Sequence, residues 1–361
     1  MAVNIYTEWG KLKEVVVGDC VNINSYNVDL SFRYFFGDNI RDEFLKNNIT
    51  LQTRLIEQRK EDLDAVAKSL EELGIRVHRP RKLEKIESFK TPHFEDWTRP
   101  IDNPRDQVLI YADEIIETSC LWRARYFEND LFKDIFKELF DRGAHWVSSP
   151  RPELRDENFD LSYLRKNPNQ DVDWQYYDSL TKSFEIMFDG AQCLKFGKDI
   201  IMNISNENHR LGAKWLQRHL RERAQVHTVQ LTDHHIDGMF MPLRPGLLLC
   251  NYSSMKDKIS LLPKPLQKWD HIYVPGPSLE TKKETPQLAS ANILVNVLPL
   301  SESMTAIFAS TKEEGLPLEK TLRKAGQEVI ILPLRHSRLF GGGLHCATLD
   351  LIRDEVCESY F

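Results

Sequence analysis

One structural unit recurs five times along this chain of 361 residues, and it constrains the fold more than any other feature. Apolar, strand-like runs precede an amphipathic helix, and a turn after the helix leads into another strand-like run, which often ends at a proline. The runs before the helices lie within residues 14–19, 108–117, 193–203, 247–250 and 293–309, where 293–297 and 306–309 are read as two strands. The predicted helices cover residues 51–73, 128–140, 209–223, 261–268 and 316–324, of which the fourth is poorer and broken by Pro263 and Pro265. The closing strands cover 75–80, 142–147, 225–229, 271–275 and 329–333. The spacing is irregular but the order is kept, which indicates an internal structural repeat.

The ratio of strands to helices indicates how these units are arranged. Three strands for each helix favour small antiparallel or mixed sheets set radially, rather than one continuous parallel sheet. A G-x-G-x-x-G fingerprint after the first strand, typical of dinucleotide-binding sheets, is missing from the sequence. We expect a last strand near the C-terminus to pair with the first one and close the ring, which removes an exposed edge. No linker divides the chain, so the prediction is a single α/β domain over residues 1–361.

A glycine-rich stretch near the C-terminus precedes that last strand. It reads Gly341-Gly342-Gly343-Leu344-His345-Cys346, followed by the strand-like run 347–353. Three successive glycines disfavour a helix or a packed strand, allow positive φ, and let other atoms come close to the backbone. A thiol between such a turn and a strand is well placed to attack a ligand. The alternative is a glycine turn beside a buried structural cysteine, because free cysteine is among the most buried residue types.

Charge and cysteine usage exclude several classes of protein. The formal net charge of -6 and the pI near 6.0 argue against a nucleic-acid or anionic-membrane partner. The first nine residues lack a basic segment followed by an apolar core, and no apolar run approaches a membrane span, so we expect neither a signal peptide nor membrane insertion. The six cysteines are scattered without a C-x-x-C pair, which predicts a reducing, cytoplasmic compartment and mostly inert thiols.

Three polar clusters lie in predicted turns or at strand ends. The first, Asp233-His234-His235-Ile236-Asp237, could hold a metal, could supply an acid/base histidine beside a cation-holding carboxylate, or could be a plain turn. Adjacent histidines in an extended chain point to opposite sides, so they cannot easily share one ion. The second and third clusters contain Asp189 before Gly190 and Asp106 after Asn103-Pro104-Arg105, and a simple turn is the alternative for both.

Together these stretches hold one cysteine, one acid/base histidine and three aspartates, with no basic cluster for phosphate. Carboxylates around a thiol raise its pKa and suit a positively charged substrate. A guanidinium is the obvious cation, because its planar set of five donors matches carboxylates in bidentate pairs.

These residues also carry a family resemblance that extends over nearly the whole chain. The sequence resembles the arginine amidinotransferases, including glycine and inosamine-phosphate amidinotransferases and relatives in natural-product and toxin biosynthesis. The matching motifs, in the family's order, are Glu8-Trp9, 12–18, Pro104-Arg105-Asp106, Trp122–Glu128, Phe188–Ala191, Leu211–Gln217, His235-Ile236-Asp237 and Gly341–Thr348. The last motif is highly specific.

The resemblance implies a five-bladed α/β propeller, the pentein fold, and a ping-pong reaction without cofactor or metal. Cys346 would attack the guanidinium carbon of L-arginine, with His235 as the general acid for ornithine and then the base for an amine acceptor. Asp189 would orient His235 and help to hold the guanidinium, and Asp106 and Asp237 would hold its nitrogens.

Two departures from the family concern residues around the catalytic groups. The second acid of the family's F-D-A-A-D-type motif is Gln192 here. The residue before the catalytic histidine is a second histidine, His234, which we expect to line the acceptor pocket.

The donor carboxylate poses a separate question. Ser290 falls where the family has a serine near this group. The family's arginine there falls on Ser254, and Lys256 or Arg244 is expected to substitute for it.

Two other functions are compatible with these residues, namely a guanidine hydrolase such as a deiminase and a non-catalytic guanidine binder. The acceptor amine is not identified by the sequence, and a homodimer is left open as the assembly. Two inserts, 22–48 and 150–183, are rich in polar and aromatic residues and fit either binding loops or surface decoration.

Overall fold

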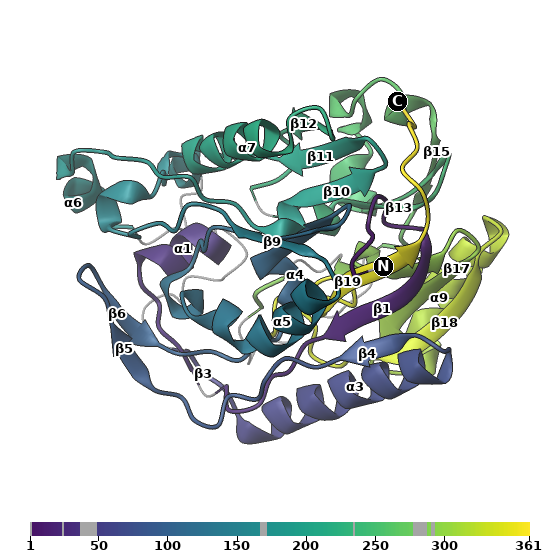
Figure 1. The fold of residues 1–361 in the computed structure, drawn as a ribbon, viewed down its shortest axis with the longest axis horizontal. Helices are drawn as coiled ribbons and strands as arrows, with labels where there is room; N and C mark the ends of the chain where they lie inside the picture. The colour runs from purple at the N-terminus through teal and green to yellow at the C-terminus, as the bar shows by residue number, and fades with distance from the viewer. Residues whose placement is uncertain are drawn as a thin grey trace.

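Five mixed sheets of three strands form the body of the molecule (Figure 1). The computed structural model describes residues 2–23, 25–36, 49–166, 172–233, 235–276, 287–289 and 293–361. In each sheet the first strand is antiparallel to the middle strand, which is parallel to the third. In that order the sheets are β19 (Thr348–Asp354), β1 (Lys11–Val17) and β4 (Arg76–His78); β7 (Val108–Tyr111), β8 (Glu114–Glu117) and β9 (His145–Ser148); β10 (Cys193–Phe196), β11 (Asp199–Asn203) and β12 (Gln225–Val229); β13 (Phe240–Arg244), β14 (Leu247–Cys250) and β15 (Asp270–Tyr273); β16 (Leu298–Ser301), β17 (Met304–Ala309) and β18 (Glu328–Pro333). The predicted repeat of five α/β units is therefore confirmed.

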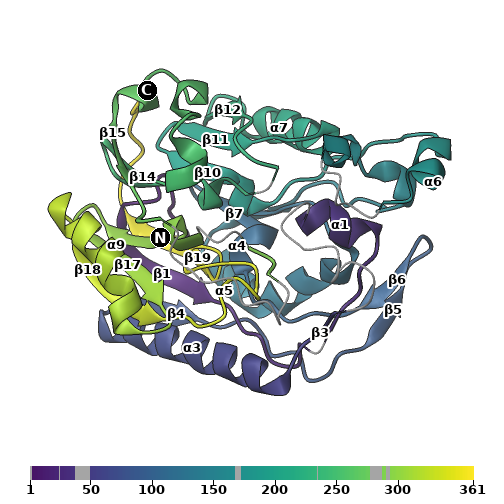
Figure 2. The ribbon, with the colours of Figure 1, turned by 180° about the vertical axis from the view of Figure 1, so that it is seen from behind.

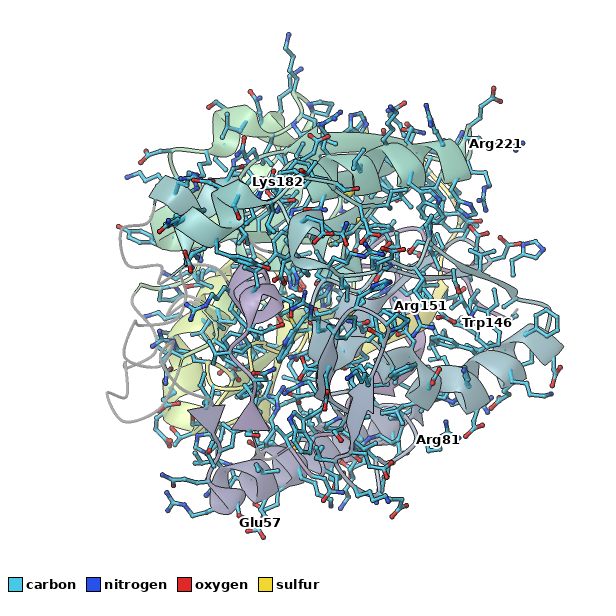
Figure 3. All side chains as sticks on the ribbon, turned by 90° about the vertical axis from the view of Figure 1, so that its left-hand side faces the viewer. Glu57, Arg81, Trp146, Arg151, Lys182 and Arg221 are labelled. Atoms are coloured by element: carbon cyan, nitrogen blue, oxygen red, sulfur yellow. The ribbon has the colours of Figure 1, made fainter. Side chains whose placement is uncertain are left out.

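In four of the units, an amphipathic helix connects the middle strand to its parallel neighbour. These helices are α3 (Thr53–Glu72), α5 (Lys133–Asp141), α7 (Glu207–Leu220) and α9 (Lys312–Lys324). Helix α3 buries Leu63, Val66 and Leu70, three apolar positions at helical spacing. The helices α3, α7 and α9 lie on the outside of the molecule (Figures 1 and 2). Charged side chains such as Glu57 and Arg221 are exposed at the periphery (Figure 3).

The fourth unit differs from its prediction. A helix over 261–268 is wrong, because the chain there forms only two short 3-10 turns, Ile259–Leu261 and Leu266–Lys268, after the four-residue helix α8 (Tyr252–Met255). Pro263 and Pro265 remove backbone donors and prevent a continuous helix. The strand β13 was not predicted, and a proline, Pro242, lies inside it.

The fifth unit also differs at its start. The apolar run 293–297 is not a strand, because Ile293–Val295 forms a 3-10 turn and the strand β16 begins only at Leu298. The backbone N–H of Asn296 donates to the carbonyl of Ile293 at 2.8 Å, which folds the chain back on itself. Local β propensity is overridden here by contacts that Asn296 makes elsewhere in the fold.

The ring closes between the two ends of the chain. Strand β19 pairs antiparallel with β1, with Val17 opposite Thr348 and Val15 opposite Asp350. Figure 1 shows the two strands side by side. The predicted pairing of the last strand with the first is confirmed, and it brings the glycine turn to the centre of the molecule.

Four smaller elements lie at the end of the molecule opposite α9 (Figures 1 and 2), namely α1 (Leu30–Phe36), β5 (Ser88–Lys90), β6 (Glu95–Trp97) and α6 (Trp174–Ser179). The short strands β2 (Ser25–Tyr26) and β3 (Ile49–Thr50) pair with each other. The short helix α4 (Pro104–Gln107) precedes β7, with proline at its first position, where a missing N–H costs nothing. Across the described ranges, no helix is both long enough and apolar enough to cross a bilayer.

Candidate active site

A cavity of about 530 Å³ contains most of the side chains singled out in the sequence. Asp106, His235, Asp237 and Cys346 line it, and Asp189 lies directly behind His235. The walls come from α1, from α4, from the segment 122–128, from the turn before β13, from α8 and from the glycine turn. Residues from several sheets thus meet in one space although they are far apart in the sequence.

Cys346 lies at the end of the glycine turn, just before β19. Gly341 has a φ of +78°, which glycine adopts without strain. A Cβ on Gly342 would lie 2.5 Å from Cys346 Cβ, and one on Gly343 would lie 2.4 Å from the ring of Phe308. The space that these two glycines leave is therefore filled by the protein itself rather than by a ligand.

The sulfur of Cys346 is held between one donor and one acceptor. The amide Nδ2 of Asn296 donates to Sγ at 3.2 Å, and Sγ donates to Asp237 Oδ2 at 3.3 Å. Burial raises the pKa of the Cys346 thiol well above its ordinary value, and the charges of Asp237 and Asp106 raise it further. The thiol is therefore protonated at neutral pH.

His235 precedes a 3-10 turn, Ile236–Gly238, and is held between two carboxylates. Its Nε2 lies 2.8 Å from Asp189 Oδ2, and its Nδ1 lies 3.6 Å from Asp106 Oδ1. Burial alone would lower the pKa of His235, but Asp106 and then Asp189 outweigh it and raise the pKa to about 9. At neutral pH the ring is an imidazolium paired with a carboxylate.

Asp189 is brought to His235 by close packing between two sheets. A Cβ on Gly190 would lie 2.4 Å from the carbonyl oxygens of Arg105 and Val108, so only glycine lets this turn approach α4. Burial raises the pKa of Asp189 to about 6, against the opposing effect of His235. The side chain of Gln192 accepts from the Asp189 N–H at 2.8 Å and donates to the carbonyl of Asn203 at 3.1 Å. An amide suits this place, because it needs both an acceptor and a donor.

Two buried carboxylate oxygens beside the cavity accept no hydrogen bond from the described residues, although one of them, Asp106 Oδ1, lies 3.6 Å from His235 Nδ1. Asp106 Oδ2 accepts from Arg125 at 2.6 Å, whereas Asp106 Oδ1 and Asp189 Oδ1 accept no hydrogen bond from any described residue. Arg125 also forms a two-pronged ion pair with Glu128, which explains why the segment Trp122–Glu128 is tied to the site. Unpaired buried acceptors are rare and costly, so they indicate a place for a ligand that brings donors.

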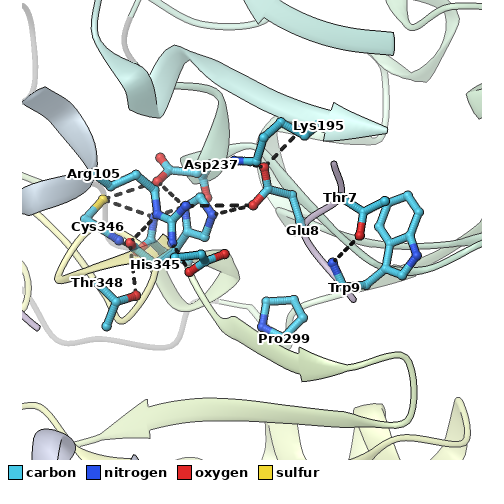
Figure 4. A network of polar contacts seen from close by, with 12 residues as sticks. Thr7, Glu8, Trp9, Arg105, Lys195, Asp237, Pro299, His345, Cys346 and Thr348 are labelled. Atoms are coloured by element: carbon cyan, nitrogen blue, oxygen red, sulfur yellow. Dashed lines mark hydrogen bonds and ion pairs between the residues drawn. The ribbon is translucent and has the colours of Figure 1, made fainter. Parts of the chain in front are cut away.

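Asp237 is engaged by the protein rather than free. Its Oδ2 accepts from His345 Nδ1 at 2.8 Å, and the opposite ring nitrogen of His345 lies 3.2 Å from Glu8 Oε2. The other oxygen of Glu8 pairs with Lys195 Nζ at 2.7 Å (Figure 4). Burial opposes the charge of Asp237, but His345 outweighs it and lowers the pKa of Asp237 below its ordinary value. A chain of buried charges therefore supports the carboxylate that touches the thiol.

Further positive side chains also line the cavity. Lys166 pairs with Asp233 at 2.7 Å, and the Arg99 guanidinium lies 4.4 Å and 4.5 Å from the ring centroids of Tyr26 and Trp122. Lys258 also lines the cavity and donates to the carbonyl of Leu231. Within the described ranges, no carboxylate pairs with the ammonium of Lys258.

The predicted contacts to a donor carboxylate are placed differently from what we expected. Ser254 lines the cavity, but neither Lys256 nor Arg244 does; Lys258 lies there instead. Ser290 and His234 lie outside the described residues. No group of three or more potential ligands fit for a metal occurs among the residues that the structure describes.

Both inserts contribute to the site in their described parts. Tyr26, Phe35 and Phe36 from the first insert line the cavity, and Phe35 meets His235 edge-on with ring centroids 5.6 Å apart. Lys166 from the second insert lines it as well. The first insert is thus part of a wall, not only surface decoration.

Sequence reasoning missed three groups around the nucleophile. No role was given to Asn296, which sits in the run read as a strand, or to His345 and Glu8, which stand inside matched motifs. Their contacts join residues 50 to 337 positions apart, so no local pattern predicts them.

Comparisons with known proteins agree with this geometry. No family model matches the chain. It is 32% identical over 366 residues to the L-arginine:L-lysine amidinotransferase of Pseudomonas savastanoi pv. phaseolicola, covering 98% of this chain and 95% of that protein. SxtG, an amidinotransferase of Microseira wollei in the saxitoxin biosynthetic pathway, is similar with a TM-score of 0.84 and 30% identity over 100% of both chains. The inosamine-phosphate amidinotransferase of Streptomyces griseus is similar with a TM-score of 0.85 and 31% identity over 99% of both chains. DDAH from Pseudomonas aeruginosa, 12% identical with a TM-score of 0.58 over 94% of this chain and 100% of that one, shares the fold alone.

Proposed function

This chain belongs to the amidinotransferase family and has its five-bladed α/β pentein fold, and we propose that it transfers the amidino group of L-arginine to a primary amine. The group would pass through a covalent adduct on Cys346. One observation carries the proposal: a thiol, an imidazolium–carboxylate pair and two unpaired carboxylate oxygens meet around a single cavity.

The unpaired oxygens of Asp106 and Asp189 support a guanidinium as the group that binds. Its five N–H donors and its charge would satisfy both oxygens, which in the free protein are buried without donors. The same positive charge offsets the carboxylates that keep the thiol protonated, so binding of the donor favours the thiolate. The nucleophile is thus activated when its substrate is present.

In the first half-reaction, the sulfur of Cys346 forms a bond to the guanidinium carbon, and the bond from that carbon to the ornithine nitrogen breaks. The ornithine nitrogen needs two protons to leave as an ammonium. One comes from the thiol and the other from the His235 imidazolium, which is protonated at neutral pH because its pKa is about 9. An amidino group then remains on sulfur.

In the second half-reaction, the acceptor ammonium returns both protons. Neutral His235 takes one of them as a general base, the amine nitrogen bonds to the amidino carbon, and the carbon–sulfur bond breaks. The sulfur regains the second proton. The carboxylate of Asp189 keeps the ring of His235 oriented in both steps through the 2.8 Å contact.

The positive side chains that line the cavity support a donor that carries a carboxylate at the end opposite its guanidinium. Lys258 is the candidate to bind that group, with the hydroxyl of Ser254 four residues earlier beside it, because both line the cavity and Lys258 has no carboxylate partner among the described residues. This is the arrangement that L-arginine requires, since it carries a cation and an anion at opposite ends. The similarity to an L-arginine:L-lysine amidinotransferase supports the same donor.

A small primary amine is the proposed acceptor, and the similarity to SxtG and the Streptomyces griseus enzyme supports a place in natural-product or toxin biosynthesis. All six cysteines are free thiols, which supports a reducing, cytoplasmic location. A single domain and a homodimer stay predictions.

The test is a panel of primary amines with L-arginine as donor, read by release of ornithine and formation of a new guanidine. We expect ornithine beyond one equivalent per active site only when a suitable amine is present. Formation of citrulline from L-arginine alone would instead identify a hydrolase. If neither citrulline nor a new guanidine forms with any amine, the protein is a non-catalytic guanidine binder.

A further inference from the structure

The amide of Asn296 holds the nucleophile at three points. Its Oδ1 accepts from the backbone N–H groups of Cys346 at 3.0 Å and Gly343 at 3.1 Å, and its Nδ2 donates to Cys346 Sγ at 3.2 Å. The backbone carbonyl of Asn296 also accepts from the N–H of His345 at 3.2 Å. Asn296 is completely buried, so water does not compete for these bonds.

The backbone donors fix which end of the amide faces the sulfur. Both N–H groups at the glycine turn need an acceptor, and within an amide only the oxygen accepts. The NH₂ group must therefore lie on the side of Sγ, and a flipped amide would set two pairs of donors against each other. The glycine turn that positions Cys346 therefore also orients the Asn296 Nδ2 group toward the sulfur.

The two partners of the sulfur act on opposite protonation states. The protonated thiol can donate to Asp237 Oδ2 at 3.3 Å, but a thiolate has no proton to donate and faces a like charge there. A thiolate gains from a donor instead. In the part of the chain that the structure describes, no group other than Asn296 Nδ2 donates to Sγ.

We propose that Asn296 is a catalytic residue that stabilises the Cys346 thiolate by an N–H donation and fixes the sulfur at the cavity. This inference rests on the proposed role of Cys346 as the nucleophile, and it adds a residue that no motif assigned. Asn296 would also stabilise the sulfur as a leaving group when the acceptor amine displaces it, because the same thiolate is formed again.

Reactivity of the free thiol tests this proposal without any substrate. The rate of alkylation of Cys346 by iodoacetamide, followed by mass spectrometry of its peptide over a range of pH, reports the thiolate fraction. In Asn296→Ala, we expect the alkylation profile to move to higher pH and the rate at fixed pH to fall roughly tenfold or more, the size of a hydrogen bond to a charged group. An unmoved profile would overturn the proposal.

A second pair of variants keeps the test decisive if Asn296→Ala does not fold. Asn296→Asp keeps an oxygen for both backbone bonds, loses the donor to sulfur and adds a negative charge. Its matched control is Asn103→Asp, which places the same charge beside the same turn, because Asn103 donates to the carbonyl of Phe340 and does not bond to Sγ. We expect a larger shift in Asn296→Asp than in Asn103→Asp. Equal shifts would overturn the proposal.

The substrate proposal can fail separately from this one. If no amine yields ornithine while the alkylation profiles move as expected, Asn296 still stabilises the thiolate and the assigned reaction is wrong. If ornithine is released but the profiles do not move, the reaction stands and the role of Asn296 is wrong.

Discussion

Asp106→Asn should make the thiol of the free enzyme more reactive and turnover slower at the same time. Asparagine has nearly the same shape, but it removes the charge and replaces one of the two acceptor oxygens by an NH₂ donor. The charge of Asp106 raises the pKa of Cys346, after burial and Asp237, and it is the largest of the effects that raise the pKa of His235. Both pKa values should therefore fall in the variant.

The magnitude of the loss in turnover follows from one bond. Asp106 Oδ1 is buried without a partner and should bind a guanidinium N–H, and a hydrogen bond to a charged group contributes about 1.5–3 kcal/mol. Losing it should lower kcat/KM for L-arginine roughly ten- to a hundredfold. Arg125 keeps its ion pair with Glu128, so we expect the fold to survive.

The dependence of ornithine release on pH shows in which direction the pKa of His235 moves. His235 must be protonated to release ornithine, and with a pKa of about 9 it is protonated below that pH and neutral above it. In Asp106→Asn the alkaline fall of ornithine release should begin at lower pH.

The assay compares iodoacetamide alkylation of Cys346 with ornithine release for the wild type, Asp106→Asn and the surface control Asp113→Asn. The control should match the wild type in both, because Asp113 is exposed and, among the residues that the structure describes, forms an ion pair with His145 alone. Slower alkylation in Asp106→Asn, or unchanged turnover, would refute the reasoning.

Three further predictions concern other parts of the molecule. Asp189→Asn should lower kcat by orders of magnitude, because His235 loses its orienting carboxylate, and a mild effect in the ornithine assay would mean that another group orients the ring. Lys258→Met should raise KM for L-arginine about tenfold or more with little effect on agmatine, which lacks the carboxylate; equal losses for both donors would contradict the assignment. Glu14→Gln should lower the free energy of unfolding by roughly 1–2 kcal/mol at neutral pH, because the partly exposed guanidinium of Arg142 and the imidazole of His78 outweigh burial and lower the pKa of Glu14 to about 2. This stabilisation is present above the unfolded pKa of Glu14 near 4.5 and is lost as pH falls toward 2. The free energies of unfolding of the two proteins, measured by urea melts, should therefore converge in acid. A difference between them that stays constant with pH would count against this ion pair.

The repeated unit could be predicted because strands and helices have their own periodicities. Amphipathic spacing at Leu63, Val66 and Leu70 predicts the helix α3, and the apolar runs predict most of the strands. Where the sequence misled, a longer-range contact decided the backbone. Asn296 turns the chain at a run rich in β-branched residues. A proline lies inside the strand β13, and two prolines interrupt the helix expected over 261–268.

The site was predictable only in part. The motifs indicated which residues gather at the cavity, and Cys346, His235, Asp106 and Asp237 all line it. Their roles stay predictions. The sequence could not indicate that Asp237 is held by His345, because that contact spans 108 positions and depends on how the ring closes. Nor could it distinguish Lys258, which lines the cavity, from Lys256, which does not.

The most direct test of the account is the mass of the Cys346 peptide after a brief incubation with L-arginine and rapid acid quenching. We predict that the wild type gains one amidino group at Cys346, that a reactive amine removes it, and that Cys346→Ala folds normally and gains nothing. An enzyme that releases ornithine without ever carrying this adduct, or a Cys346→Ala variant that retains activity near that of the wild type, would contradict the central claim.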